Sequence, residues 1–346
     1  MAGQTRVVLV TGVARYLGGR LARMLTEDPT IERVIGVDVV PPRDDIGAAE
    51  FVRADIRNPI IAKVIASAEV DTVVHMSVLA QPGSAGGRMV MKEVNVIGTM
   101  QLLAACQKAP SVRKLVVKSS STVYGASPKD PAMFTEDMEP RALPRAGFAK
   151  DSVEVEGYVR GFARRRPDVT VTVLRFANFL GPRIETPMSA YFSLPVVPTV
   201  LGFDPRLQFV HEEDGLEVLR RTTVADHPGT FNIAGDGVLL LSQAVHRAGR
   251  PTLPLFAPFV SSIGGLVRRA RVVDFSPEQL RFLTYGRGLD TTRMRTRLGF
   301  EPQWTTSDTF DDFVRAHHLN RYLPPSTVEA VEDRLAAVLV GSRSHG

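Results

Sequence analysis

Short apolar runs recur along the first half of the chain and alternate with stretches in which apolar residues recur at helical spacing. The first run, residues 7–10, is entirely apolar. A run of this kind is typical of a strand buried on both faces, as in a parallel sheet. Further strands are predicted at residues 34–37, 51–56, 72–75, 114–118 and 170–174, and helices at residues 17–25 and 92–109, with a later helix carrying Lys150.

A glycine turn lies between the first predicted strand and the first predicted helix. Gly12, Arg15 and Gly18 follow one another at intervals of three residues. A strand, a tight glycine turn and a helix start direct backbone N–H groups and the positive end of the helix dipole at one point, which suits a phosphate group. The same turn can serve packing alone, so the rest of the chain must decide between the two interpretations.

An acidic residue closes the second predicted strand. Asp38 stands about twenty residues beyond Gly18, where a carboxylate accepts hydrogen bonds from the adenosine ribose of a dinucleotide. A 2′-phosphate beside this carboxylate would be repelled. The glycine turn and Asp38 together therefore predict an NAD site rather than an NADP site.

The composition limits the classes of function. A chain of 346 residues with 44% hydrophobic residues is long enough for one large domain, or for one domain with a smaller partner. The net charge of +5 argues weakly for an anionic small substrate. Basic residues are not interleaved with aromatic ones, so we expect no nucleic-acid partner. The single cysteine, Cys106, excludes an internal disulfide and a multi-cysteine metal site.

The distribution of apolar residues predicts no membrane association. The first predicted strand begins within a few residues of the start of the chain, which leaves no room for a signal peptide. Later apolar stretches such as residues 194–203 are interrupted by prolines and are too short to cross a bilayer. We therefore expect a cytoplasmic location.

The glycine turn resembles the TGxxGxxG motif of the extended short-chain dehydrogenase/reductase superfamily, with Arg15 in place of the middle glycine. Other segments resemble motifs of its NAD-dependent epimerase/dehydratase family, namely NVIGT at 95–99, SSSTVYG at 119–125, LRFANFLGP at 174–182, LDTTR at 289–293 and LGFEP at 298–302. The resemblance implies an α/β fold with a doubly wound parallel sheet, of the Rossmann type, and a small C-terminal substrate lobe. We predict a core at 1–182, an interleaved lobe at 183–316 and a C-terminal extension at 317–346.

The resemblance implies NAD as the cofactor. Arg15 would either displace the cofactor slightly or place its guanidinium on a phosphate. Asp55 resembles the adenine-binding aspartate of the family, although it can also be read as a helix N-cap. The cofactor-binding residues implied in this way are Gly12, Arg15, Tyr16, Leu17, Gly18, Asp38, Asp55, Ile56, Met76, Ser77, Asn95 and Lys150.

The catalytic motif of the superfamily, Tyr-x-x-x-Lys, is incomplete. We align its lysine with Lys150, which would bind the nicotinamide ribose, and the tyrosine position is then Ala146. Tyr124 is the tyrosine that we expect nearest to the nicotinamide, and Ser120, four residues before it, would polarise the reacting oxygen. Loss of a general acid/base removes about 10²–10⁴-fold in rate. The implied catalytic residues are Ser120, Lys150 and Tyr124.

Substrate contacts are expected from the second half of the chain. Asn178 lies in the LRFANFLGP segment, whose asparagine commonly contacts substrate in the family, and Ser120 contributes from the strand before. Arg183 and Arg206 are candidates for an anionic nucleotide group, because a guanidinium can bind a diphosphate through two hydrogen bonds. His211 stands beside three carboxylates, but we interpret this segment as a structural turn and predict no metal site.

The resemblance implies an NAD-dependent epimerase/dehydratase that acts on a nucleotide sugar by transient hydride transfer. Two alternatives stay open. One is an NAD-binding sensor or scaffold that has lost turnover, favoured by Arg15 and Ala146, and the other is an oxidoreductase of the same superfamily acting on a non-sugar substrate. We expect a homodimer, because relatives usually dimerise through the helices that bear Asn95 and Lys150.

Overall fold

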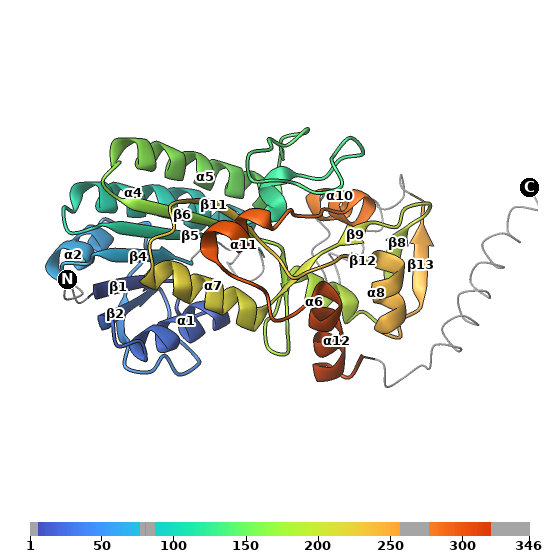
Figure 1. Cartoon of the computed structure of the whole chain (residues 1–346), viewed down its shortest axis with the longest axis horizontal. Coiled ribbons are helices and arrows are strands. Elements are labelled where there is room, and N and C mark those ends of the chain that lie inside the picture. Colours follow the sequence, from blue (N-terminus) through green and yellow to red (C-terminus); the bar gives the residue numbers. More distant parts are fainter. Residues whose placement is uncertain (1–5, 77–79, 81–86, 257–276, 320–346) are drawn as a thin grey trace, which may run out of the picture.

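A computed structural model describes residues 6–76, 80, 87–256 and 277–319. Its centre is a sheet of seven strands in the order β11-β6-β5-β4-β1-β2-β3 (Figure 1). Every neighbouring pair in this sheet is parallel. The strands are β1 (Arg6–Thr11), β2 (Ile31–Asp38), β3 (Glu50–Arg53), β4 (Thr72–His75), β5 (Lys114–Ser120), β6 (Thr170–Phe176) and β11 (Gly229–Ile233).

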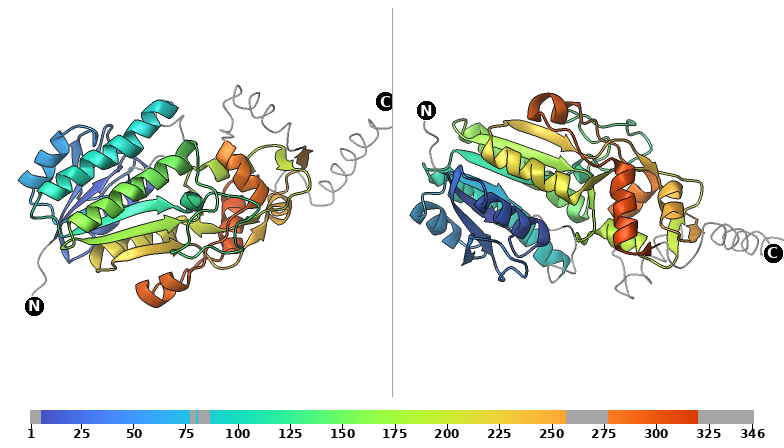
Figure 2. Two further views of the ribbon diagram at one scale, coloured as in Figure 1. Left: turned by 90° about the horizontal axis from the view of Figure 1, so that it is seen from above. Right: turned by 60° about the horizontal axis from the view of Figure 1, so that its bottom comes forward.

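Helices cover both faces of this sheet (Figure 2). One face packs against α2 (Ile60–Ser67), α4 (Thr99–Lys108) and α5 (Gly147–Arg165), and the other against α1 (Tyr16–Thr26), α7 (Glu212–Val224) and α11 (Thr292–Leu298). The helix predicted at 92–109 begins earlier, as α3 (Arg88–Lys92), and contains a π-helical turn (Glu93–Gly98) before α4. The doubly wound parallel sheet predicted from the sequence is confirmed.

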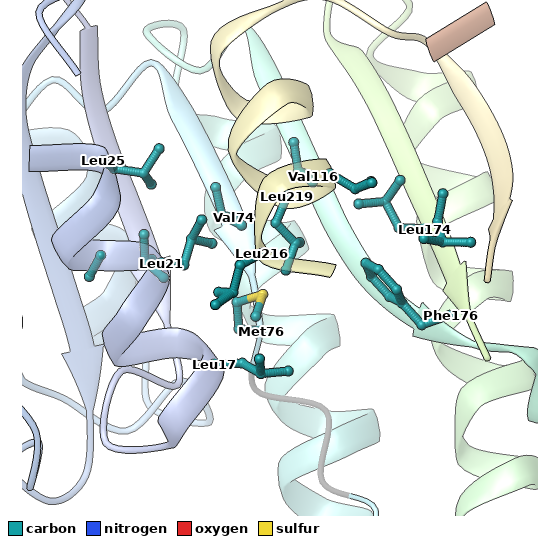
Figure 3. Close-up of a cluster of buried hydrophobic side chains, with 14 of the residues drawn as sticks. Leu17, Leu21, Leu25, Val74, Met76, Val116, Leu174, Phe176, Leu216 and Leu219 are labelled. Carbon is teal, nitrogen blue, oxygen red and sulfur yellow. The ribbon is translucent and has the colours of Figure 1, made fainter. Parts of the chain in front are cut away.

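The alternation of side chains along each strand explains the apolar runs. Successive residues of a strand point to opposite faces, so both faces need apolar residues where both are covered. In β1, Val8 and Val10 lie in the core beneath α1 and α7, whereas Leu9 lies in the core beneath α2 and α4. Figure 3 shows the first of these cores, with Leu17 and Leu21 of α1 facing Val74 and Leu216.

A second core forms beside the sheet, next to the carboxyl ends of β6 and β11, where the chain leaves the sheet (Figure 1). This core combines aliphatic with aromatic residues, and the side chains of Phe192, Phe209 and Phe310 contact one another there. Its elements are β7 (Asn178–Leu180), α6 (Pro187–Phe192), β8 (Val197–Val200), β9 (Arg206–Leu207), β10 (Phe209–His211), β12 (Leu239–Leu240), α8 (Leu241–Arg247), β13 (Thr252–Leu255), α10 (Pro277–Tyr285) and α12 (Thr306–Ala316).

The chain crosses between the two cores several times. The segment 183–316, predicted as an interleaved lobe, supplies α7, β11 and α11 to the sheet as well as the elements of the second core. The exact domain boundaries stay a prediction, and most of the extension at 317–346 lies outside the described residues. None of the helices in the described part of the chain has the length and apolar character needed to cross a bilayer.

Candidate functional site

The glycine turn after β1 has the shape that the sequence predicts. Gly12 has a φ of +80°, and its N–H donates to the carbonyl of Val37 at 2.8 Å. A Cβ on Gly18 would lie 2.2 Å from the carbonyl oxygen of Gly12, so only glycine allows α1 to pack so closely on the turn. The backbone at the start of α1 is thereby held beside the carboxyl end of β1, where a dinucleotide phosphate would bind.

Gly18→Ala is expected to distort this turn. The added methyl group has to displace backbone atoms, so we expect a loss of roughly 2–4 kcal/mol in the free energy of unfolding, measured by urea denaturation, with a matching loss of NAD binding. Gly157→Ala in α5 is the control, because its Cβ would meet only a side-chain nitrogen at 4.0 Å. That variant should keep or slightly gain stability. Equal stabilities for the two variants would contradict the prediction.

The carboxylate of Asp38 is directed at the glycine turn. One oxygen accepts the N–H of Ala14 at 3.1 Å, and the other accepts the N–H of Val39 at 2.7 Å. The charge of Asp38 also acts on Arg15, although burial is the larger effect and lowers the pKa of that guanidinium. Asp38 thus stands beside the turn, as its predicted role with the adenosine ribose requires.

Asp55 and Ile56 lie in the loop after β3. The carboxylate of Asp55 pairs with Arg57 at 2.6 Å, and hydrogen bonds from Arg57 lower its pKa. The N-cap interpretation of Asp55 is wrong, because α2 begins at Ile60 with Pro59 as its N-cap. Ile56 is buried and would be 2.8 Å from a Cβ on Gly98. An adenine role for this pair stays a prediction.

Three other predicted cofactor residues help to build the core beside the turn. Leu17 and Met76 are buried there (Figure 3). Tyr16 donates its hydroxyl to Glu212 of α7 at 2.8 Å, and burial together with this carboxylate raises its pKa to about 12. Tyr16 therefore joins α1 to α7. Ser77 lies outside the described residues.

Asn95 lies fully buried in the π-helical turn and reaches the helix that follows β5. Its amide donates to the carboxylate of Asp151 at 3.2 Å. Arg88 donates to both oxygens of the same carboxylate, at 2.6 and 2.7 Å. Asn95 therefore braces the start of α5, and a direct contact with the cofactor stays a prediction.

Lys150 lies on the outer face of α5, contrary to the predicted alignment. It precedes the buried Val159 by two and a half helical turns, so the two side chains leave the helix on opposite sides. The side chain of Lys150 is 44% exposed, and its ammonium lies 3.8 Å from Glu154. The predicted ribose contact requires the inner face, so the alignment must be corrected.

The inward-facing pair with the spacing of Tyr-x-x-x-Lys is Phe148 and Ser152. Ser152 is buried, and its hydroxyl donates to the carbonyl of Phe148 at 2.9 Å. Glu156, one turn further on the same face, is buried as well. We therefore propose that the register is shifted by two residues, so that Phe148 rather than Ala146 stands at the tyrosine position of the motif and Ser152 at its lysine position.

Tyr124 belongs to a buried polar network beneath the end of β5. Its hydroxyl donates to Asn232 at 2.8 Å and accepts from Arg175 at 2.8 Å, and burial raises its pKa. Arg175 in turn pairs with Glu156 at 2.6 Å, and Glu156 accepts the hydroxyl of Ser119 at 2.6 Å. Tyr124 has both hydroxyl partners inside the protein, so the expectation that it acts in catalysis is corrected to a structural role.

Ser120 ends β5 on the opposite face of the strand from Ser119. It is half-buried, and its hydroxyl oxygen accepts the N–H of Thr122 at 3.3 Å. Within the described residues this hydroxyl makes no other hydrogen bond, so its proton is available for a bound oxygen atom. Ser120 thus remains the candidate for polarising the reacting oxygen.

The predicted substrate residues come from the segments that join the two cores. Asn178 begins β7 and is half-buried, and the side chains of Arg183 and Arg206 are exposed. The N–H of Arg183 donates to Glu212 at 3.2 Å, and the carbonyl of Arg206 accepts the N–H of Arg287 at 3.1 Å. Substrate contacts for these three residues stay predictions.

Two cations, the buried Arg287 and the half-buried Lys118, escaped the sequence analysis. Arg287 donates to the carbonyl of Gly125 at 2.8 Å and to Ser121 at 3.2 Å, and burial lowers its pKa to about 10. It therefore ties the loop after α10 to the loop after β5. Lys118 lies inside β5, two residues before Ser120 and on the same face. A charged residue inside an apolar strand was the signal that could have identified Lys118.

The segment with His211 is a helix cap. The ring of His211 accepts the N–H of Glu213 at 3.2 Å, lies 3.3 Å from Asp312 and stacks on Trp304 with ring centres 4.1 Å apart. Across the described ranges, histidine, cysteine and carboxylate side chains form no group of three or more that could hold a metal ion.

Comparisons with known proteins point to one family. The sequence model of the NAD dependent epimerase/dehydratase family matches residues 8–234. An uncharacterised protein of Mycobacterium tuberculosis is 51% identical over 95% of this chain and 89% of its own length. A UDP-glucose 4-epimerase of Mycolicibacterium smegmatis is 29% identical over 85% of this chain and 93% of its own length.

Solved structures share the fold. The UDP-glucose 4-epimerase of Thermotoga maritima, solved with UDP-glucose, has a TM-score of 0.69 at 20% identity, covering 90% of this chain and 98% of that chain. The UDP-glucuronic acid 4-epimerase of Bacillus cereus, solved with NAD, has a TM-score of 0.67 at 18% identity over the same shares.

Proposed function

Because this chain belongs to the NAD-dependent epimerase/dehydratase family, we propose that it binds NAD and oxidises a nucleotide sugar transiently, as an epimerase or dehydratase does. The glycine turn is the observation that supports the cofactor most directly, since Gly18 lets α1 start close against Gly12 and so holds the helix N-terminus beside the turn. Related proteins named as epimerases of UDP-glucose and UDP-glucuronic acid support the substrate class.

Ser120 is the residue that we assign to the reacting oxygen. NAD, when bound, supplies the hydride acceptor for the carbon that carries the sugar hydroxyl. The hydroxyl of Ser120 would donate a hydrogen bond to that oxygen as it becomes a carbonyl. Phe148 cannot accept the proton of that hydroxyl, because it has no ionisable group, so the proton would pass to solvent water. The proposed reaction is therefore slow compared with that of a family member that retains the tyrosine.

The replacement of the motif also favours a second function. A protein that binds NAD without turnover could report the cofactor or a nucleotide sugar to a partner, and such a sensor needs neither the tyrosine nor the lysine. The presence of Phe148 and Ser152 at the motif positions supports this sensor function. A non-sugar substrate is the remaining alternative, and homodimer formation stays a proposal.

A panel of nucleotide sugars separates these functions. The purified protein is loaded with NAD, binding is confirmed by calorimetry, and each compound is added while near-UV absorbance and fluorescence of reduced nicotinamide are followed. We expect a UDP-sugar to produce the signal of reduced nicotinamide. In Ser120→Ala this signal should appear roughly 10²-fold more slowly. Ser67→Ala, at an exposed position of α2, is the matched control. Silence across the panel with NAD bound would support the sensor instead.

A further inference from the structure

Lys118 lies near the carboxyl end of β5, the strand between β4 and β6. Val116, Lys118 and Ser120 leave β5 on one face, and Val116 lies in the core beneath α1 and α7 (Figure 3). The ammonium of Lys118 lies 6.0 Å from the ring centre of Phe179 in β7. The side chain therefore lies on the face of the sheet that packs against α1 and α7, and the charge of Arg15 in the glycine turn acts on its ammonium.

The charge of Lys118 is not balanced by the protein. Within the described part of the chain, its ammonium has no hydrogen bond and no ion pair, and burial followed by the charge of Arg15 lowers its pKa to about 8. Lys114, at the other end of the same strand, shows how this chain satisfies a buried lysine, since it contacts Asp226 at 2.7 Å and the carbonyl of Thr223 at 3.0 Å. Lys118 lacks equivalent partners.

The titratable groups around Lys118 are cationic or neutral. The charge of Arg15 in the glycine turn acts on Lys118, and the charge of Lys118 acts in turn on His75 of β4. Burial and the charge of Lys118 lower the pKa of His75 to about 4, so this ring is neutral around neutral pH. Two cations at one edge of the sheet, next to a turn shaped for phosphate, create a field that favours an anion.

We propose that Lys118 and Arg15 together bind the diphosphate group of NAD, with Lys118 supplying its charge from β5 and Arg15 from the glycine turn. The proposal rests on the proposed function only for the identity of the cofactor. It explains why a lysine stands in an apolar strand with no carboxylate paired to it among the described residues. In this proposal the guanidinium of Arg15 binds a phosphate and does not displace the cofactor.

The experiment measures the affinity for NAD by calorimetry as a function of pH. Because Lys118 loses its proton as the pH rises through about 8, the wild type should bind NAD roughly tenfold more weakly at about pH 9.5 than at about pH 7. Arg15 stays protonated and His75 stays neutral over this range. Lys118→Met should bind about tenfold to a hundredfold more weakly at neutral pH and should show no pH dependence.

Three comparisons isolate the diphosphate. Lys118→Arg should retain the affinity at neutral pH and keep it at high pH, because a guanidinium does not lose its proton there. Lys118→Met should weaken the binding of ADP-ribose, which carries the diphosphate, and leave the binding of adenosine unchanged. Lys114→Met is the control for loss of a buried lysine, and should lower stability while retaining the pH dependence of NAD affinity.

The outcomes separate this proposal from the proposed function. Retained NAD affinity and pH dependence in Lys118→Met would overturn the role of Lys118, whatever the nucleotide-sugar panel shows. Loss of both in Lys118→Met, together with silence across that panel, would support the cation pair and reject turnover. Because burial disfavours the charged amine, Lys118→Met should unfold at a temperature no lower than that of the wild type. A lower unfolding temperature would therefore identify a folding defect.

Discussion

The double substitution Phe148→Tyr and Ser152→Lys is expected to raise the rate of nucleotide-sugar oxidation by about 10²–10⁴-fold. The two positions lie four residues apart on the inner face of α5, where a tyrosine and a lysine would face the end of β5 and Ser120. The tyrosine would accept the proton of the sugar hydroxyl, and the lysine would lower its pKa. The measurement is the appearance of reduced nicotinamide after mixing with the substrate found in the panel.

Variants in the uncorrected register provide the control for this prediction. Ala146→Tyr restores the motif with Lys150, but Lys150 lies on the outer face, so we expect no gain in rate. Phe148→Tyr alone should give a smaller gain than the double variant. A gain from Ala146→Tyr, with none from the double substitution, would show that the register deduced from burial is wrong.

The substitution Glu156→Gln is expected to lower the free energy of unfolding by about 3–5 kcal/mol. Both partners of the Glu156–Arg175 pair are buried, and Arg175 would be left as a buried charge without a counter-charge. Burial by itself would lower the pKa of Arg175, but the hydrogen bonds and charge of Glu156 outweigh this effect and raise it. The variant removes that charge, but a guanidinium keeps its proton even when it is buried, so Arg175 remains charged and bears the penalty.

Urea denaturation followed by circular dichroism measures this loss, with Glu154→Gln as the matched control. Glu154 lies on the same helix, is partly exposed and contacts Lys150 at only 3.8 Å, so its loss should cost less than about 1 kcal/mol. A similar cost for both variants would contradict the proposed role of the buried pair. Because Arg175 and Glu156 hold Tyr124 and Ser119 beneath the end of β5, we also expect Glu156→Gln to weaken NAD binding.

The sequence was sufficient for features that depend on local order. Apolar runs of strand length identify β1, β2, β4, β5 and β6, because a strand covered on both faces needs apolar residues at consecutive positions. The glycine turn is equally local, since Gly12 adopts a positive φ and Gly18 excludes a Cβ through atoms only a few residues away. The fold class and the NAD-binding family followed from these segments.

The register of α5 could not be read from the same information. Glu154 lies four residues after Lys150, and Glu156 lies four residues after Ser152. The linear sequence alone does not show which of these two registers the helix adopts. Only Glu156 faces Arg175 of β6, across the sheet, and this long-range pair decides which helical face is buried. The identity of the residues in the catalytic positions changes with that choice.

The sequence by itself thus determined the sheet, the phosphate turn and the family, because each depends on short-range sterics and on the burial of consecutive residues. The tertiary structure alone decided which cations have partners. Lys114 and Lys118 are similar in sequence, both lying in one apolar strand, but Asp226 approaches only the first of them. The charge environment of such a side chain depends on residues distant in sequence, so only the packed chain shows that Lys118 is subject to the charge of Arg15 and, among the described residues, is paired with no carboxylate.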